Sequence, residues 1–272
     1  MNHPDRSLAN GYAKEEQMEH VTSADGTTIA YDRVGSGSPV ILVGGALCDR
    51  NSHGPLAEAL ADEYDVITYD RRGRGDSGDT TPYDVQREVE DIAALLTATG
   101  GTTAIYGHSS GAALAAIAAV TLPFSQVVLH EPPYGPDDAD TSDDGRQVIE
   151  ALRDGRNQDA VEQFLLMTGL PKEIAQQVAA TPGLADVAPT LPYDFAVMGH
   201  ALDHGGTPVA LLRRVTADTL VLAGTATAPF MIDAAHRITE ILPNATYADL
   251  PGQQHAVPPE ALAPVLKDFL RR

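Results

Sequence analysis

Gly107-His108-Ser109-Ser110-Gly111 is the stretch that decides the fold of this chain. The apolar run Thr103–Tyr106 precedes it, and the small-residue run Ala112–Val120 follows it. A serine at the centre of G-x-S-x-G, between a strand and a helix, is typical of a nucleophile elbow. The turn forces the serine into a strained backbone conformation, and a Cβ at either glycine would collide with the neighbouring strand or helix. The motif therefore predicts a strand, a sharp turn that carries Ser109, and a helix.

Strands and helices alternate on both sides of this motif. Several runs are continuously apolar and rich in β-branched residues, which is typical of strands buried on both faces of a parallel sheet. The predicted strands are Thr27–Val34, Pro39–Val43, Asp65–Asp70, Thr102–Tyr106, Gln126–Glu131, Thr219–Gly224 and Thr246–Leu250. The rhythm predicts an α/β fold with a doubly wound, mostly parallel β-sheet.

The strand pattern stops between about residues 134 and 205, where helical segments take over. Four helices without a strand partner, inserted between two strands, predict a helical cap over one end of the sheet. We therefore expect a core domain of residues 19–133 and 206–272, a cap of residues 134–205, and an N-terminal tail of residues 1–18.

Charge and composition narrow the class of partner. The chain has 18 Lys and Arg against 38 Asp and Glu, a formal net charge of −20, which disfavours nucleic acid and anionic membranes as partners. Its single cysteine, Cys48, excludes an internal disulfide framework. No stretch approaches the roughly 20 apolar residues that span a bilayer. We expect a cytoplasmic protein, and no pattern indicates an oligomeric state.

Three motifs together resemble the α/β-hydrolase fold superfamily, over about residues 20 to 271. They are the elbow, the octapeptide Asp70-Arg71-Arg72-Gly73-Arg74-Gly75-Asp76-Ser77, and Pro251-Gly252 ahead of His255. The resemblance implies a ligand crevice beyond the carboxyl ends of the strands, roofed by the cap. The fold hosts esterases, lactonases, thioesterases, peptidases and C–C bond hydrolases. A serine at position 109 argues against the dehalogenase and epoxide-hydrolase branches, which use a carboxylate nucleophile.

The resemblance also implies a base and an oxyanion hole for Ser109. A serine hydroxyl is a poor nucleophile and needs a base, which the family places in the loop of His255. The oxyanion hole should combine the N–H groups of Ser110 and Ala46. The family often has a histidine where this chain has Gly44. Cys48 is predicted to be a buried thiol, not a second nucleophile.

The acid of the triad departs from the family pattern. The family usually supplies an Asp after the strand Thr219–Ala223, but the loop Gly224–Pro229 has no carboxylate. Glu131, which ends the preceding strand, is the preferred candidate, and Asp233 is an alternative. The remaining alternative is that the site has no acid, or a distant one such as Asp249. The order serine, acid, histidine holds for Glu131 and for Asp233.

Substrate contacts are expected largely from the cap. The predicted contacts are Tyr134, Phe164, Tyr193 and Phe195. Arg213 and Arg214 are the only cations expected near the crevice, which favours a neutral, moderately hydrophobic acyl substrate.

The sequence thus predicts a serine hydrolase for a small-molecule ester, lactone or thioester, with an acyl-enzyme intermediate and with no cofactor or metal. One alternative is a C–C bond hydrolase or perhydrolase that uses the same residues. The other is a non-hydrolytic, ligand-binding protein on this scaffold, suggested by the missing acid in the usual loop and by Gly44.

Overall fold

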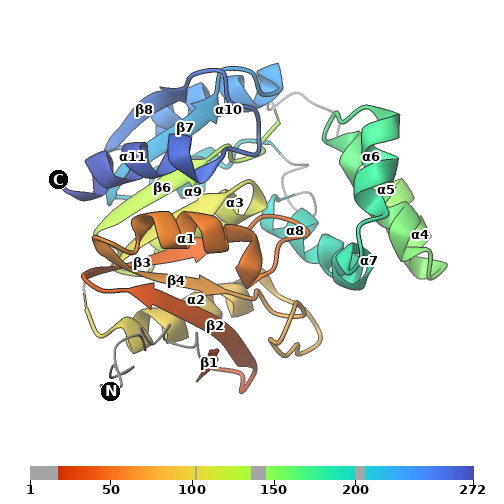
Figure 1. Ribbon diagram of the computed structural model, residues 1–272, viewed down its shortest axis with the longest axis horizontal. Helices are drawn as coiled ribbons and strands as arrows, with labels where there is room; N and C mark the ends of the chain where they lie inside the picture. Colours follow the sequence, from red (N-terminus) through yellow and green to blue (C-terminus); the bar gives the residue numbers. More distant parts are fainter. Residues whose placement is uncertain (1–17, 102, 136–144, 200–205) are drawn as a thin grey trace, which may run out of the picture.

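An eight-stranded sheet forms the centre of the molecule (Figure 1), in the order β1-β2-β4-β3-β5-β6-β7-β8. The computed structural model describes residues 18–101, 103–135, 145–199 and 206–272. The strands are β1 (Glu19–Thr22), β2 (Thr28–Gly35), β3 (Ser38–Val43), β4 (Tyr64–Tyr69), β5 (Ala104–His108), β6 (Gln126–His130), β7 (Asp218–Gly224) and β8 (Ala245–Leu250). Strand β2 pairs antiparallel with β1 and β4, and all other pairs are parallel. The predicted α/β fold with a mostly parallel sheet is confirmed.

Helices cover both faces of this sheet. Helices α1 (Gly54–Leu60) and α11 (Pro259–Leu270) pack on one face, and α2 (Val85–Thr99), α3 (Ser110–Ala119) and α10 (Pro229–Ile241) pack on the other. Because both faces are covered, a central strand such as β4 is buried at every position. Of the helices in the described segments, none combines the length and the apolar character needed to cross a bilayer.

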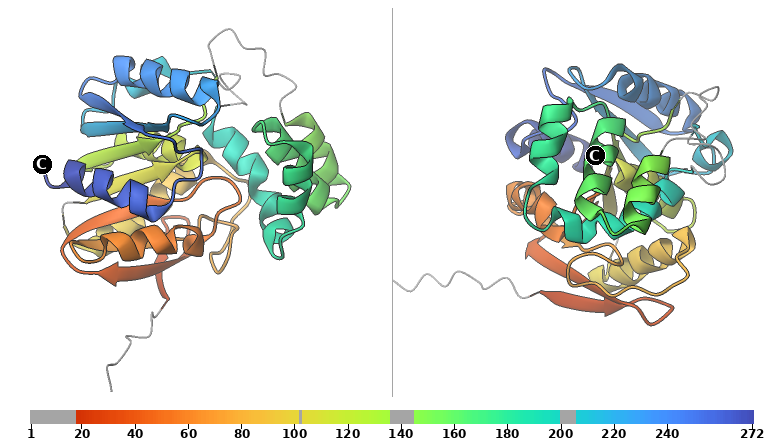
Figure 2. Two further views of the ribbon diagram at one scale, coloured as in Figure 1. Left: turned by 45° about the horizontal axis from the view of Figure 1, so that its top comes forward. Right: turned by 90° about the vertical axis from the view of Figure 1, so that its right-hand side faces the viewer.

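The chain between β6 and β7 is helical. It contains α4 (Arg146–Arg153), α5 (Asn157–Met167), α6 (Lys172–Ala179), α7 (Leu184–Val187), a 3₁₀ turn (Ala188–Thr190) and α8 (Leu191–Val197), and α9 (Val209–Leu212) leads into β7. Figure 2 shows α4, α5 and α6 set off from the sheet, while α8 lies next to the core. These helices share an apolar cluster of their own, against which Ala46 and Leu47 of the core pack. Of the predicted N-terminal tail, all but Met18 lies outside the described residues.

Candidate active site

Ser109 lies at the centre of the sheet, between the end of β5 and the start of α3, with φ 56° and ψ −126°. A Cβ added to Gly107 would lie 2.3 Å from the carbonyl oxygen of Gly111, and one added to Gly111 would lie 2.4 Å from that of Val43. Both positions therefore require glycine, for the steric reason expected from the motif. Ser109 is the N-cap residue of α3, yet its side chain makes no capping hydrogen bond. Its hydroxyl is thus available for another partner.

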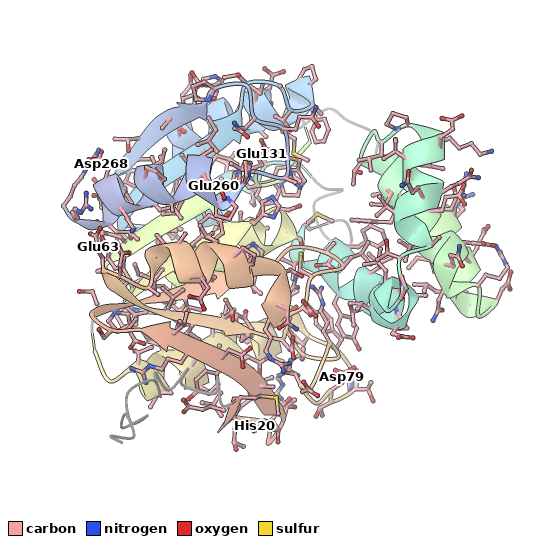
Figure 3. The ribbon with its side chains drawn as sticks, viewed as in Figure 1. His20, Glu63, Asp79, Glu131, Glu260 and Asp268 are labelled. Carbon is pink, nitrogen blue, oxygen red and sulfur yellow. The ribbon has the colours of Figure 1, made fainter. Side chains whose placement is uncertain are left out.

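Glu131 and His255 are in direct contact. The Nδ1 atom of His255 lies 2.5 Å from Oε2 of Glu131. The same carboxylate accepts hydrogen bonds from the N–H of Gly224 at 2.8 Å and from the hydroxyl of Thr227 at 2.9 Å. Figure 3 shows Glu131 at the end of the core that faces helices α4, α5 and α6, opposite Glu63 and Asp268.

The carboxylate of Glu131 is fully buried and ionised. Burial alone raises its pKa, but the hydrogen bonds from His255 and from the N–H of Gly224 outweigh burial and hold the pKa below its ordinary value. An ionised carboxylate only accepts hydrogen bonds, so Nδ1 of His255 carries a proton. This tautomer leaves Nε2 of the imidazole free to take a proton from a nucleophile.

The other two candidate acids lie apart from His255. Asp233 is exposed on α10, and Asp249 of β8 accepts a hydrogen bond from the hydroxyl of Tyr247 at 2.6 Å. Within the described part of the chain, neither acid contacts His255. The loop Gly224–Pro229, where the family usually keeps the acid, instead supplies two donors to Glu131.

The loop after β3 lies against Ser109. A Cβ added to Gly45 would lie 3.6 Å from Oγ of Ser109. The N–H groups of Ala46 and Ser110 have no hydrogen-bond partner among the described residues. A side chain at Gly44 would begin 2.9 Å from Cβ of Cys48, so Cys48 takes the space that a histidine at Gly44 would need.

Backbone strain gathers at this site. Among the described residues, three that are not glycine have a positive φ: Leu47 at 61°, Ser109 at 56° and Glu131 at 49°. They follow the carboxyl ends of β3, β5 and β6, which are neighbours in the order β3-β5-β6. Such strain persists only where the surrounding structure enforces it, and it concentrates at functional sites.

Three more histidines, His53, His108 and His130, form a chain of neighbouring rings that reaches His255. Their contacts are not evident from the sequence. Nε2 of His108 lies 3.0 Å from the carbonyl oxygen of His255, and the two rings are 4.6 Å apart. Burial lowers the pKa of His108 well below its ordinary value, that of His130 to about 3 and that of His53 to about 4. These rings are therefore neutral near pH 7. With Cys48, they line a cavity of about 280 Å³.

The thiol of Cys48 is a weak candidate nucleophile. Burial raises its pKa, so the thiol stays protonated near neutral pH. Within the described residues, His, Cys, Asp and Glu side chains form no group of three that could hold a metal ion.

The predicted substrate contacts take different places. Phe164 and Phe195 lie in the apolar cluster of the cap, with ring centroids 6.2 Å apart. Tyr134 is buried in the core cluster that contains α3. Tyr193 stacks on Tyr83 at 3.9 Å, and its hydroxyl donates a hydrogen bond of 2.6 Å to Asp79. Tyr193 therefore joins α8 to the core.

Comparison with known proteins agrees with this fold. A family model described as "Alpha/beta hydrolase family" matches residues 40–266. An alpha/beta hydrolase from Sphaerobacter thermophilus is 43% identical, with a TM-score of 0.85 over 93% of this chain and 100% of that chain. A thermophilic esterase from Thermogutta terrifontis is 24% identical, with a TM-score of 0.74 over 94% of this chain and 98% of that chain.

A shorter match links the chain to RutD from Enterobacter cloacae, a protein named as a proposed carbamate hydrolase. It is 38% identical over 80 residues, which are 28% of this chain and 30% of RutD. The chain spans about a third of the length of the curated relatives it matches. With the family model covering most of its length, the chain belongs to the alpha/beta hydrolase family.

Proposed function

We propose that this protein is a serine hydrolase that cleaves a small-molecule ester, lactone or thioester through an acyl-enzyme intermediate. The observation that carries the proposal is the hydrogen bond between buried, ionised Glu131 and Nδ1 of His255, at the edge of the sheet where the neighbouring strand β5 leads into the strained Ser109. The pair provides an oriented base, and the elbow provides the nucleophile that needs one.

In the proposed reaction, Oγ of Ser109 attacks the carbonyl carbon while Nε2 of His255 takes the hydroxyl proton. The carbonyl oxygen becomes an oxyanion, which the N–H groups of Ala46 and Ser110 stabilise. His255 then gives its proton to the departing alcohol or thiol, and Glu131 stabilises the imidazolium between these two steps. His255 next deprotonates a water molecule, which attacks the acyl-enzyme. As the bond between the acyl carbon and Oγ of Ser109 breaks and the acid leaves, His255 returns the proton to that Oγ.

The charges around the site favour a neutral acyl group. Arg213 and Arg214 are exposed at the end of α9. Phe164 and Phe195, in the cluster that packs on Ala46, are the best candidates for contacts with an apolar acyl chain.

The structure bears on the two observations that suggested a non-hydrolytic protein, which are the missing acid in the usual loop and the glycine at position 44. Glu131 occupies the position of an acid beside His255, although the usual loop has none. Cys48 accounts for the absence of a side chain at Gly44. Both departures from the family pattern are therefore compatible with hydrolysis.

A fluorophosphonate probe, which reacts with activated serines, tests the proposal. We expect it to label the wild type and the variant Ser38→Ala, whose exposed serine is a matched control, and to leave Ser109→Ala unlabelled. Hydrolysis of p-nitrophenyl esters should fall by at least about 10³-fold in Ser109→Ala. An unlabelled wild type, or equal labelling of Ser109→Ala, would contradict the proposal. A series of acyl lengths and lactones then defines the substrate class.

A further inference from the structure

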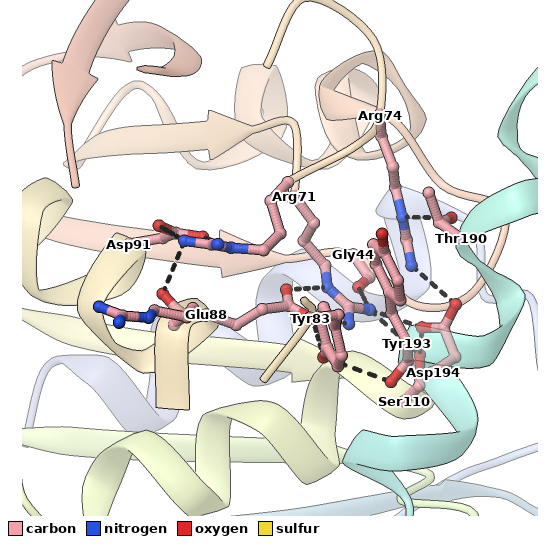
Figure 4. Close-up of polar contacts among 12 residues, drawn as sticks. Gly44, Arg71, Arg74, Tyr83, Glu88, Asp91, Ser110, Thr190, Tyr193 and Asp194 are labelled. Carbon is pink, nitrogen blue, oxygen red and sulfur yellow. Dashed lines mark hydrogen bonds and ion pairs between the residues drawn. The ribbon is translucent and has the colours of Figure 1, made fainter. Parts of the chain in front are cut away.

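A buried ionic cluster joins the loop after β3, the elbow and the cap (Figure 4). It consists of Arg71, Arg74, Glu88 and Asp194, each at most 2% exposed, and we call it the arginine cluster. Glu88 receives two hydrogen bonds from the guanidinium of Arg71, at 2.7 and 2.6 Å. Asp194 receives one bond of 2.7 Å from Arg71 and another of 2.7 Å from Arg74. The two positive and two negative charges balance.

The arginine cluster holds the backbone of the loop after β3. Nη1 of Arg74 donates to the carbonyl oxygen of Gly45 at 2.7 Å and to that of Cys48 at 3.3 Å. Nη1 of Arg71 donates to the carbonyl oxygen of Gly44 at 3.4 Å. The strongest of these contacts, by its length, is the one between Arg74 and Gly45.

That contact fixes the direction of a neighbouring N–H group. The carbonyl of Gly45 and the N–H of Ala46 belong to one peptide unit, which is planar and holds the two groups in opposite directions. A guanidinium that holds the Gly45 oxygen on one side therefore holds the Ala46 N–H on the other side. The positive charge of the Arg74 guanidinium, next to the carbonyl oxygen of Gly45, also polarises this peptide group and strengthens its N–H as a hydrogen-bond donor.

The same cluster reaches the side chain of Ser110, the residue whose N–H is the second donor of the proposed oxyanion hole. Oδ1 of Asp194 accepts a hydrogen bond of 2.7 Å from the hydroxyl of Ser110. Asp194 belongs to α8, the helix of the cap that lies next to the core. One carboxylate of the cap thus bonds both to the arginine that holds Ala46 and to the residue that follows the nucleophile.

We infer that Arg74 and Asp194 are positioning residues for the oxyanion hole. Arg74 orients the Gly45–Ala46 peptide, and Asp194 holds Arg74 and Ser110 in one arrangement, so α8 takes part in forming the hole. The inference rests on the proposed serine-hydrolase function. It also gives the loop a brace in place of the side chain that Gly44 lacks.

The variant Arg74→Lys tests the inference without changing the charge of the cluster. A lysine ammonium lacks the planar fork with which Arg74 binds Gly45, Thr190 and Asp194 at once. The matched control is Arg72→Lys. Arg72 is equally buried and donates to Asp91 at 2.8 and 2.7 Å and to Asp25 at 3.0 Å, but it contacts neither Gly45 nor Ser110.

The readouts are kcat, KM and the inhibition constant of an alkyl trifluoromethyl ketone, whose adduct with a serine carries an oxyanion. We expect Arg74→Lys to lower kcat and the affinity for the ketone in parallel, by about 10 to 10²-fold, with KM changed less than about threefold. Arg72→Lys should lower the melting temperature by a similar amount to Arg74→Lys, and it should leave both kcat and the ketone affinity unchanged. If the role of Arg74 were merely structural, Arg74→Lys and Arg72→Lys would have similar kcat values and similar affinities for the ketone.

Ser110→Ala provides a second, milder variant, which keeps the N–H and removes only the hydroxyl bonded to Asp194. We expect kcat and the ketone affinity to fall together by up to about tenfold. If Arg74→Lys fails to fold, Ser110→Ala alone tests the inference. An active wild type with unchanged ketone affinity in Ser110→Ala and in any folded Arg74→Lys would overturn the inference. A wild type that neither hydrolyses esters nor reacts with the fluorophosphonate would instead overturn the proposed function.

Discussion

Replacement of Glu131 by glutamine should abolish most activity while leaving the size of the side chain unchanged. Three donors converge on the carboxylate: His255 and Thr227 on Oε2, and the N–H of Gly224 on Oε1. A glutamine offers one oxygen and one NH₂ group in their place. If the NH₂ replaced Oε1, it would face the N–H of Gly224, and a buried donor left without a partner costs about 1–3 kcal/mol. The NH₂ therefore replaces Oε2.

In that orientation the hydroxyl of Thr227 can rotate to accept, but Nδ1 of His255 must also accept. Its proton then moves to Nε2, which can no longer take the proton of Ser109. The tautomer error, together with the loss of the charge that stabilises the imidazolium, should lower kcat by about 10⁴-fold, or about 5.4 kcal/mol in the activation barrier.

The assay is hydrolysis of a p-nitrophenyl ester at pH 7.5, with the melting temperature as a check on folding. Asp233→Asn is the control, because its side chain is exposed on α10, and it should stay within about twofold of the wild type. The reasoning fails if folded Glu131→Gln keeps more than about a tenth of the wild-type kcat. A large loss in Asp233→Asn would assign the acid to that residue instead.

Two further predictions concern stability. His53, His108 and His130 have pKa values below the unfolded value of 6.5, so the unfolded chain binds more protons as the pH falls from 6.5 towards 4. The free energy of unfolding should therefore fall as the pH falls through that window, with a slope of at most about 4 kcal/mol per pH unit for three protons. Urea unfolding measures this slope, and a flat profile between pH 6.5 and 5 would contradict the prediction. Gly111→Ala should lose about 3 kcal/mol or more in thermal unfolding because its Cβ meets backbone, whereas Gly54→Ala, with no atom within 4 Å, should be unaffected or slightly more stable. Equal stability of the two alanine variants would refute the steric argument for the elbow.

The fold could be predicted because a strand buried on both faces leaves a continuous apolar run. Pro39–Val43 and Asp65–Asp70 correspond to β3 and β4 within one residue at each end. Helix α7, Leu184–Val187, has only four residues, too few for a helical period to be visible, and it was not expected. The sequence pattern also predicts a helix over residues 193–204. In the structure α8 begins two residues earlier, at Leu191, and ends at Val197, while residues 200–205 lie outside the described part.

The pairing of Glu131 with His255 could be predicted because it depends on strand ends. Residues that follow parallel strands meet at one edge of a sheet, and β6, which Glu131 follows, lies between β5 and β7. The contact of Arg74 with Asp194 could not be predicted from the sequence, because 120 residues separate the two and neither belongs to a repeating pattern. The sequence predicts Arg213 and Arg214 as the only cations near the crevice. In the structure, Nη1 of Arg71 also lies 3.4 Å from Oγ of Ser110, and Arg74 bonds to Asp194, which accepts from the same hydroxyl. Glu88 and Asp194 neutralise these two arginines.

The helices between β6 and β7 are not all attached to the core in the same way, and this difference bears on how the protein can be redesigned. Helix α8 is fastened to the core through Tyr193 and Asp194, whereas α4, α5 and α6 pack mainly on one another and extend away from the sheet. Residues 146–179 can therefore be exchanged or recombined with those of relatives as a module. Helix α8, whose Asp194 accepts a hydrogen bond from the hydroxyl of Ser110, stays in place during such an exchange.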